Sequence, residues 1–422
     1  MVQLLHTPEG VKDYYNDEFA RKDALRRRIK DTFSRYGYRG IQTPSFEYFD
    51  IFNAERGSVS SRDMYKMIDR NGETLVLRPD FTPSIARCAA KYYGAESLPV
   101  RFCYEGNTFI NNSSYQGRLK ETTQAGIELI GDDSLAADAE VIALAVDCMK
   151  SAGLSEFQVE IGQVDFFNGL LQEAGLQEEV IEVLRDLIGN KNFFGVEERL
   201  KAESLPEDLT RAFLALPQLF GSADQVFEKA RTLTKNPVAL AAVDRLEQLY
   251  ELLTAYEVND YITFDLGMLG NYQYYTGIIF QGYTYGTGDY IVTGGRYDNL
   301  MVQFGKDAPS VGFGISVDTL MSAIQRQKIQ EELPWDETMI LYEPSELSLA
   351  IALGGLYRKN GRKVSLTEKR SLAGEYMEYA AEHRIGSILL LTGKSEAITV
   401  IQTRTGETTS VPVPGEIRRG NR

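Results

Sequence analysis

Apolar residues recur along this chain at two different spacings, and the changes between them outline its parts. Between Asp17 and Tyr36 they lie three or four positions apart, which predicts an amphipathic helix that Gly37 ends. Short β-prone runs then dominate as far as residue 161. They predict strands at 39–46, 64–68, 74–77 and 158–161, with helices at 84–93 and 138–151. Pro44 places the first of these strands at a sheet edge, because proline cannot donate a ladder hydrogen bond.

A long hairpin is the most distinctive element of this first part. Two β-prone runs between Arg101 and Gly131 are joined by a connection rich in Gly, Asn and Ser, which predicts antiparallel strands with an exposed tip. Residues 109–114 of the tip carry no charge, and the next arginine is Arg118. Hairpins of this kind often bind a nucleotide phosphate through arginine, so the neutral tip bears directly on function.

The pattern becomes purely helical from residue 166 to 255, which predicts an all-helical insertion between two sheet-forming parts. Strands resume at 261–265, 275–283 and 289–293. Tyr274 and Tyr275 are adjacent, and neighbouring residues of a strand point to opposite faces. One of these two rings is therefore expected to face a cavity.

The remaining part of the chain alternates strands with helices. Val311–Ile315 is a strand interrupted by glycines, which permit close backbone approach, and a helix follows it. The polar segment 329–336 contains Pro334 and is interpreted as a linker. Strands at 339–342, 363–366 and 387–391, helices at 347–358 and 373–383 and a hairpin at 397–411 then predict a small α/β domain. The predicted organisation is a domain at 1–328 that contains the insertion, the linker, a second domain at 337–415 and a frayed tail at 416–422.

Composition narrows the functional classes. Among 422 residues, 60 Asp and Glu outnumber 45 Lys and Arg, so the net charge is −15 and argues against strong nucleic-acid binding. Arg26, Arg27, Arg28 and Lys30 could form a local basic face, although a solvated helix face is the simpler interpretation. Three scattered cysteines and two histidines argue against a disulfide framework or a metal centre. No apolar run is long enough to span a bilayer, so we expect a soluble, cytoplasmic protein without a membrane partner.

Several motifs resemble those of histidyl-tRNA synthetases and occur in the same order. They are LRPDFT at 77–82, the hairpin, YYTGIIF at 274–280, GGRYDNL at 294–300 and VGFGIS at 311–316. The resemblance covers nearly the whole chain. It implies an α+β fold with a class II synthetase-like antiparallel sheet, flanking helices and a helical insertion. It also implies a small α/β domain like an anticodon-binding domain, and dimerisation through the first class II motif.

Three positions depart from the synthetase pattern. The resemblance places arginines that bind ATP and the amino-acid carboxylate, or that act in catalysis, at the positions occupied here by Ile110, Gly270 and Thr319. Amino-acid adenylation develops negative charge on the α-phosphate, and losing one preorganised donor costs about 100- to 1,000-fold in rate. The loss of three cationic positions predicts that the chain does not adenylate an amino acid.

The amino-acid pocket of the synthetases is largely present. Carboxylates and hydroxyls suit an ammonium group and an imidazole N–H. The positions that the resemblance assigns to histidine binding are Asp80, Thr82, Arg118, Gln124, Glu128, Tyr274 and Tyr275.

An amino-acid pocket without an ATP site resembles the regulatory subunits of ATP phosphoribosyltransferase. That resemblance implies a chain with no catalytic residues, cofactor or metal of its own. Its partner is a short-form catalytic subunit, which carries out the first step of L-histidine biosynthesis, and histidine is the feedback effector. No tRNA is expected to bind. Many members of this family lack the C-terminal domain, so the role of 337–415 stays open. So does the location of the effector histidine, which could bind in the pocket or at the subunit interface.

Two alternatives remain at this point. One is a divergent, active histidyl-tRNA synthetase in which Arg118 or Lys120 supplies the missing charge. The other is a free-standing histidine sensor or RNA-binding module on the same scaffold. Pyrophosphate exchange would distinguish the first, and binding of histidine without a catalytic partner would identify the second.

Overall fold

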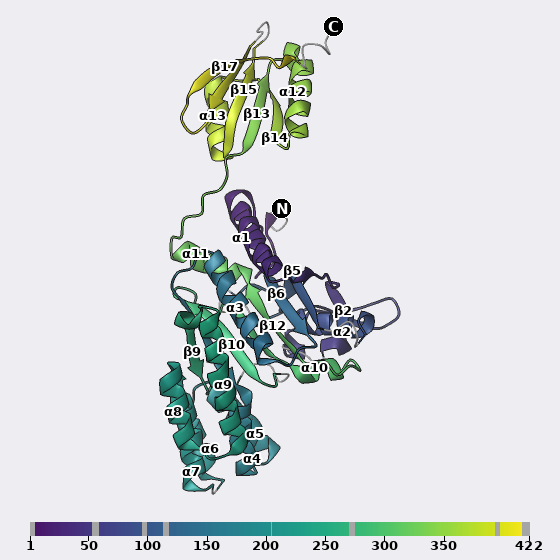
Figure 1. The fold of residues 1–422 in the computed structure, drawn as a ribbon. Helices are drawn as coiled ribbons and strands as arrows, with labels where there is room; N and C mark the ends of the chain where they lie inside the picture. Colours follow the sequence, from purple (N-terminus) through teal and green to yellow (C-terminus); the bar gives the residue numbers. More distant parts are fainter. Residues whose placement is uncertain are drawn as a thin grey trace. The chain divides into compact units, whose positions relative to one another are not determined.

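The fold was analysed in a computed structural model of the full chain (Figure 1). The residues that the structure describes are 5–52, 59–94, 99–112, 118–203, 205–269, 275–392 and 397–415. The chain divides into two compact units. The first comprises residues 1–14 and 22–329, and the second comprises residues 15–21 and 330–422.

A nine-stranded sheet forms the centre of the first unit, in the order β1-β5-β6-β12-β11-β10-β7-β9-β8. Its pairings are antiparallel except β1–β5 and β7–β9, which are parallel. The strands are β1 Arg39–Gly40, β5 Val100–Phe109, β6 Glu121–Ile130, β7 Phe157–Gln163, β8 Phe220–Gly221, β9 Ile262–Asp265, β10 Ile278–Thr284, β11 Val292–Arg296 and β12 Ser310–Ser316. The mostly antiparallel sheet with flanking helices confirms the predicted fold class.

The predicted hairpin is β5–β6, and it pairs without interruption from Val100↔Ile130 to Phe109↔Glu121. Ala125, Ile127 and Leu129 of β6 belong to the main hydrophobic core, whereas the residues between them face the other side of the sheet. The core side is covered by α1 Asn16–Arg35, α3 Leu135–Ser151 and α11 Val317–Arg326 (Figure 1). This alternation leaves the opposite side of β6 free for polar side chains.

The helical insertion follows β7 and consists of six helices. They are α4 Val164–Ala174, α5 Glu178–Gly189, α6 Phe193–Lys201, α7 Glu207–Ala215, α8 Ala223–Leu233 and α9 Pro237–Ala255. The prediction that this segment is entirely helical is wrong at one place, because β8 lies inside it and pairs with β9 at the sheet edge. Two residues are too few to produce a recognisable alternation, so periodicity could not reveal β8.

A second, three-stranded sheet has the order β2-β4-β3 and precedes the hairpin. Its strands are β2 Phe46–Tyr48, β3 Lys66–Ile68 and β4 Thr74–Leu77, and α2 Thr82–Tyr92 follows directly. The short helix α10 Asp298–Val302 packs against α2. Single turns of 3₁₀-helix occur at Phe49–Phe52, Ser61–Asp63, Leu216–Gln218, Asn259–Tyr261 and Pro344–Glu346.

The second unit is a five-stranded sheet in the order β14-β13-β15-β16-β17. Its core lies on two faces, one packed against α12 and one against α13. This confirms the predicted strand and helix alternation. The elements are β13 Glu337–Tyr342, α12 Leu347–Lys359, β14 Lys363–Glu368, α13 Ala373–Glu382, β15 Ile385–Leu391, β16 Ala397–Gln402 and β17 Thr408–Pro412.

Within the described ranges, no helix combines the length and apolar character needed to cross a bilayer.

Candidate functional site

Glu128 is the centre of a polar cluster on the side of the sheet away from the main core. Only 1% of the surface of Glu128 is exposed to solvent. The hydroxyl of Thr82 donates a hydrogen bond to its Oε1 atom at 2.7 Å, and the hydroxyl of Tyr297 donates to its Oε2 atom. Burial raises the pKa of Glu128 to about 8, and repulsion from Asp80 adds to this, whereas the two donated hydrogen bonds lower it. A cationic or N–H-bearing ligand would therefore stabilise the ionised carboxylate.

Two glycines of β12 make room for the polar side chains of β6. Gly312 pairs directly with Glu128 in the sheet, and a Cβ atom at Gly312 would lie 1.9 Å from Glu128 Oε2. A Cβ atom at Gly314 would lie 2.2 Å from Gln124 Nε2. Atoms at such distances overlap, so any larger residue would displace Glu128 or Gln124. The glycine-interrupted strand in the sequence thus serves the site, because it lets side chains lie flat across the sheet.

Asp80 lies at the start of α2 and lines the same cavity. It is 8% exposed, and its Oδ1 atom accepts a hydrogen bond from the backbone N–H of Phe81 at 2.6 Å. The N–H of Thr82 lies 3.4 Å from the same atom. Asp80 therefore stabilises the beginning of α2, while its position places a second carboxylate near Glu128.

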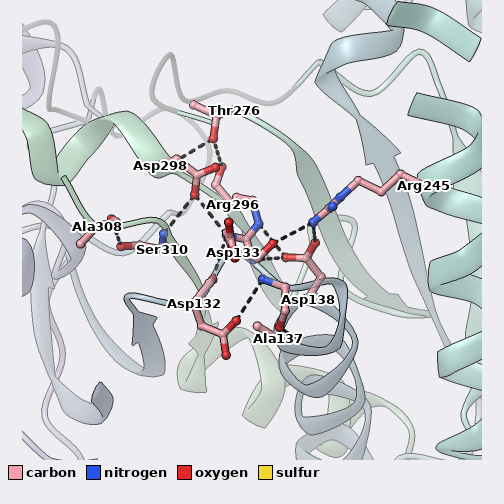
Figure 2. A network of polar contacts seen from close by, with 11 residues as sticks. Asp132, Asp133, Ala137, Asp138, Arg245, Thr276, Arg296, Asp298, Ala308 and Ser310 are labelled. Atoms are coloured by element: carbon pink, nitrogen blue, oxygen red, sulfur yellow. Dashed lines mark hydrogen bonds and ion pairs between the residues drawn. The ribbon is translucent and has the colours of Figure 1, made fainter. Parts of the chain in front are cut away.

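An ion-pair network fixes the segment that carries Tyr297. Arg296, the last residue of β11, donates from Nε to Asp138 Oδ1 at 2.8 Å and from Nη1 to Asp298 Oδ1 at 3.1 Å. Arg245 of α9 donates to the other oxygen of Asp138 at 2.7 Å. Figure 2 shows Arg296 and Arg245 converging on Asp138 at the start of α3. Arg296 also donates from Nη1 to the carbonyl oxygen of Asp132 at 3.1 Å. Tyr297 thus follows a residue held by three acceptors, which fixes where its hydroxyl meets Glu128.

The cavity encloses about 30 Å³, roughly the space of one water molecule. Its described lining residues are Asp80, Thr82, Tyr104, Gln124, Glu128, Tyr275, Thr293, Tyr297, Gly312, Phe313 and Gly314.

The structure brings five of the seven residues assigned to histidine binding to this cavity: Asp80, Thr82, Gln124, Glu128 and Tyr275. Tyr275, one of the two adjacent tyrosines, thus faces a cavity. Its ring packs closely against Gly295, where a Cβ atom would lie 2.7 Å from the ring. Tyr274 lies outside the described residues. Arg118 does not line the cavity. Its side chain is 65% exposed and lies 3.7 Å from Asp289.

Sequence reasoning missed Tyr297 as a site residue. GGRYDNL was recognised as a motif, but neither it nor the glycines of VGFGIS received a role in binding. Gly312 and Glu128 become neighbours only when β6 and β12 pair. That pairing, between strands far apart in the chain, becomes visible only in the structure.

The positions that carry arginine in the synthetase pattern are neutral here. Ile110 follows β5, and its backbone N–H donates to Lys120 O at 2.8 Å. Thr319 lies in the first turn of α11, where its hydroxyl is 2.7 Å from Ser316 Oγ. Gly270 lies outside the described residues.

Asp318, next to Thr319, is occupied by interactions within the protein. Lys22 Nζ and the Tyr14 hydroxyl lie 2.7 and 2.6 Å from its Oδ1 atom. The backbone N–H of Thr123 donates to its Oδ2 atom at 2.6 Å. In the described ranges, no group of acidic, His or Cys side chains is arranged to hold a metal ion.

Known proteins resemble this chain over most of its length. A family profile described as histidyl-tRNA synthetase matches residues 10–320. An ATP phosphoribosyltransferase regulatory subunit from Acetivibrio thermocellus is 39% identical over 409 residues, covering 97% of each chain. One from Ruminiclostridium cellulolyticum is 38% identical over 396 residues, covering 94% of each. The chain belongs to the ATP phosphoribosyltransferase regulatory subunit family. This family shares the histidyl-tRNA synthetase-like fold, and the family assignment confirms the resemblance seen in the motifs.

Solved structures also resemble this chain in their three-dimensional fold. A structure from Bacillus halodurans, described as an ATP phosphoribosyltransferase regulatory subunit/histidyl-tRNA synthetase, has a TM-score of 0.80 and 31% identity. It covers 92% of this chain and 97% of its own. Histidyl-tRNA synthetase from a Nostoc species has a TM-score of 0.81 over 99% of both chains, but only 20% identity, so it shows the fold alone. Membership of the family therefore rests on the closer relatives.

Proposed function

We propose that this chain is a non-catalytic regulatory subunit of ATP phosphoribosyltransferase. It joins a short-form catalytic subunit in the first step of L-histidine biosynthesis and takes part in feedback inhibition by histidine. One observation carries the proposal: among the described residues, the cavity at Glu128 is lined by carboxylates, hydroxyls and an amide but by no arginine or lysine. Such a lining can bind an amine or an imidazole, yet it offers nothing for a triphosphate.

The effector is L-histidine, bound in this cavity. Its ammonium group is held by Asp80, and its imidazole N–H donates to Glu128, whose Oε atoms already face Thr82 and Tyr297. A ligand that binds one arrangement of these side chains better than another shifts the population toward it, and this is how occupancy of the cavity would reach a partner subunit.

The chain works without tRNA, in the cytoplasm, and self-associates as a dimer through the class II interface. The three-stranded sheet β2-β4-β3 supports this association. Phe46, Tyr48 and Met67 share one face of this sheet through their pairing with β4, and they are 54%, 57% and 38% exposed. Large apolar side chains clustered on one sheet commonly mark a protein contact.

Reconstitution with the catalytic partner tests the proposal. Mixing the purified chain with the short-form catalytic subunit at micromolar concentration should yield a larger complex with phosphoribosyltransferase activity, and histidine should inhibit it. Absence of both complex and activity would contradict the proposed function.

The location of the effector is tested separately in the same complex. Asp80→Asn should preserve assembly and raise the histidine concentration for half-inhibition about tenfold or more, because a charge-assisted hydrogen bond is lost. Glu228→Gln is the matched control, since Glu228 is exposed on α8 and does not line the cavity. Calorimetric titration of histidine into both variants measures the affinity directly. An unchanged affinity in Asp80→Asn would place the effector elsewhere.

A further inference from the structure

Arg78 is a buried arginine in the LRPDFT motif at 77–82, and its side chain joins two segments that are distant in the chain. Its Nε atom donates to the carbonyl oxygen of Asn107 in β5 at 2.9 Å. Its Nη1 atom donates to the carbonyl oxygens of Thr43 and Pro44, just before β2, at 2.9 and 3.1 Å. The guanidinium is therefore fixed in position by backbone groups on both sides.

Burial makes the charge of Arg78 costly. Desolvation lowers the pKa of Arg78, and the smaller effects of Glu47 and Tyr104 oppose this. Glu47 forms its own ion pair with Arg87 at 2.7 Å. An apolar residue of similar volume could fill the same space without the cost of desolvation. What an apolar residue or a lysine lacks is a planar fork of donors that reaches two segments at once and stacks on a ring.

The guanidinium is the first layer of a stack of side chains that ends at the cavity. It lies 3.9 Å from the centre of the Phe81 ring. The Phe81 ring stacks in turn on Tyr104, with 4.4 Å between the ring centroids and 23° between the ring planes. Both rings are buried, and Tyr104 lines the cavity at Glu128. Arg78 thus reaches the cavity through two aromatic layers.

Glycines of the hairpin make room for this stack. A Cβ atom at Gly106 would lie 2.6 Å from Arg78 Nη2. Tyr104 pairs with Gly126 across β5 and β6, and a Cβ atom at Gly126 would lie 2.4 Å from the Tyr104 hydroxyl oxygen. Gly126 and Glu128 are two positions apart in β6, so the stack and Glu128 share one side of the sheet.

We propose that Arg78 is a positioning residue for histidine binding, which acts through Phe81 and Tyr104. Its hydrogen bonds hold the first layer of the stack, and the stack holds the Tyr104 ring in the wall of the cavity. Arg78 itself does not line the cavity. This inference rests on the proposed binding of histidine there.

Calorimetric titration of histidine into the wild type and Arg78→Lys tests the proposal. Lysine keeps the charge, but it cannot hold both segments and stack on Phe81. The affinity for histidine should fall about three- to thirtyfold, as expected for the loss of one cation–π contact. Arg87→Lys is the matched control, because Arg87 also lies on the buried side of a contact with β2 but does not line the cavity or stack on Phe81. It should leave the affinity unchanged.

A double-mutant cycle shows whether Arg78 acts through the stack. Phe81→Leu keeps an apolar side chain and removes the ring between Arg78 and Tyr104. The double variant should bind histidine no more weakly than the weaker of the two single variants, because the second change affects a stack that is already broken. An arginine with a purely structural role would lower the unfolding temperature without this dependence. Losses of affinity that multiply in the double variant would overturn the proposal.

Gly106→Ala tests the same stack without removing Arg78. Its methyl group would overlap the guanidinium, so the histidine affinity should fall again, whereas Gly40→Ala should bind normally because nothing lies within 4 Å of a Cβ atom there. Thermal unfolding shows that each variant is folded at the temperature of the titration. Wild-type affinity in Arg78→Lys or Gly106→Ala, or an equal loss in Arg87→Lys, would overturn this inference alone. Absence of histidine binding in the wild type would refute the proposed effector site and this inference with it.

Discussion

Glu128 shows at the scale of a residue how burial changes the chemistry of a carboxyl group. Its pKa is near 4.5 in the unfolded chain and about 8 in the folded protein. Between these values the folded state binds more protons, so the free energy of unfolding should fall as pH rises from 5 to 8. Each unit of pKa difference corresponds to about 1.4 kcal/mol, so the loss amounts to a few kcal/mol at most.

Glu128→Gln should remove this contribution to the pH dependence. Glutamine keeps the shape of the side chain, and its amide can still interact with Thr82 and Tyr297. Urea unfolding of the wild type and the variant at pH 5 and pH 8 gives the comparison, with Glu228→Gln as a control that should follow the wild type. Parallel stability profiles for Glu128→Gln and wild type would contradict the assignment of the raised pKa to Glu128.

Gly312 is the second residue on which the cavity depends. A methyl group there would overlap Glu128 Oε2 and lie 2.4 Å from the carbonyl oxygen of Ile127. Gly312→Ala should therefore cost about 1–3 kcal/mol of stability through overpacking, and it should weaken histidine binding by displacing Glu128. Gly40→Ala is the control, because nothing lies within 4 Å of a Cβ atom at that position. Denaturant unfolding and calorimetry measure the two effects, and a Gly312→Ala protein that binds histidine normally would refute the role of the glycine.

At the scale of elements, the network around Asp138 joins α3 to β11 and to α9 of the insertion. Asp138 is fully buried and Arg296 is 4% exposed. Removing one partner of a buried pair leaves an uncompensated charge, so Asp138→Asn should destabilise the protein by about 3–5 kcal/mol. It should also weaken histidine binding, because Tyr297 follows Arg296 directly.

An exposed ion pair in the same insertion provides the matched comparison. Arg231 of α8 contacts Asp244 and Glu247 of α9 near the surface. Arg231→Met should cost less than about 1 kcal/mol, since surface pairs are solvated and screened. Denaturant unfolding of both variants tests the contrast. Similar losses of stability in the two variants would show that the buried network stabilises the protein no more than an exposed ion pair does.

At the scale of the whole molecule, the neutral residues that we interpret as replacements of synthetase arginines lie in distant segments. Ile110 follows β5, and Thr319 lies in the first turn of α11. Histidine-dependent exchange of pyrophosphate with ATP should therefore be undetectable for this chain, while an authentic histidyl-tRNA synthetase shows it under the same conditions. Exchange above background would instead support a divergent, active synthetase.

The arrangement of the molecule was largely predictable from local patterns. The hairpin, the helical insertion and the strand and helix alternation after residue 337 all match observed elements. The exceptions have physical causes. β8 is too short to show a period, and α2 begins at Thr82, two residues before the predicted helix, because Pro83 suits a first helical turn.

The sequence by itself determined the types of elements, their order and the residues from which a polar pocket could be built. These depend on periodicity and on motifs of adjacent residues, which are local properties of a chain. The tertiary structure decided which of these residues meet. Tyr297 reaches Glu128 because β12 lies between β6 and β11, whereas Arg118 lies at the surface beside Asp289. Strand order and register bring together segments that are more than a hundred residues apart in the chain. Local sequence patterns do not specify which of these distant strands pair.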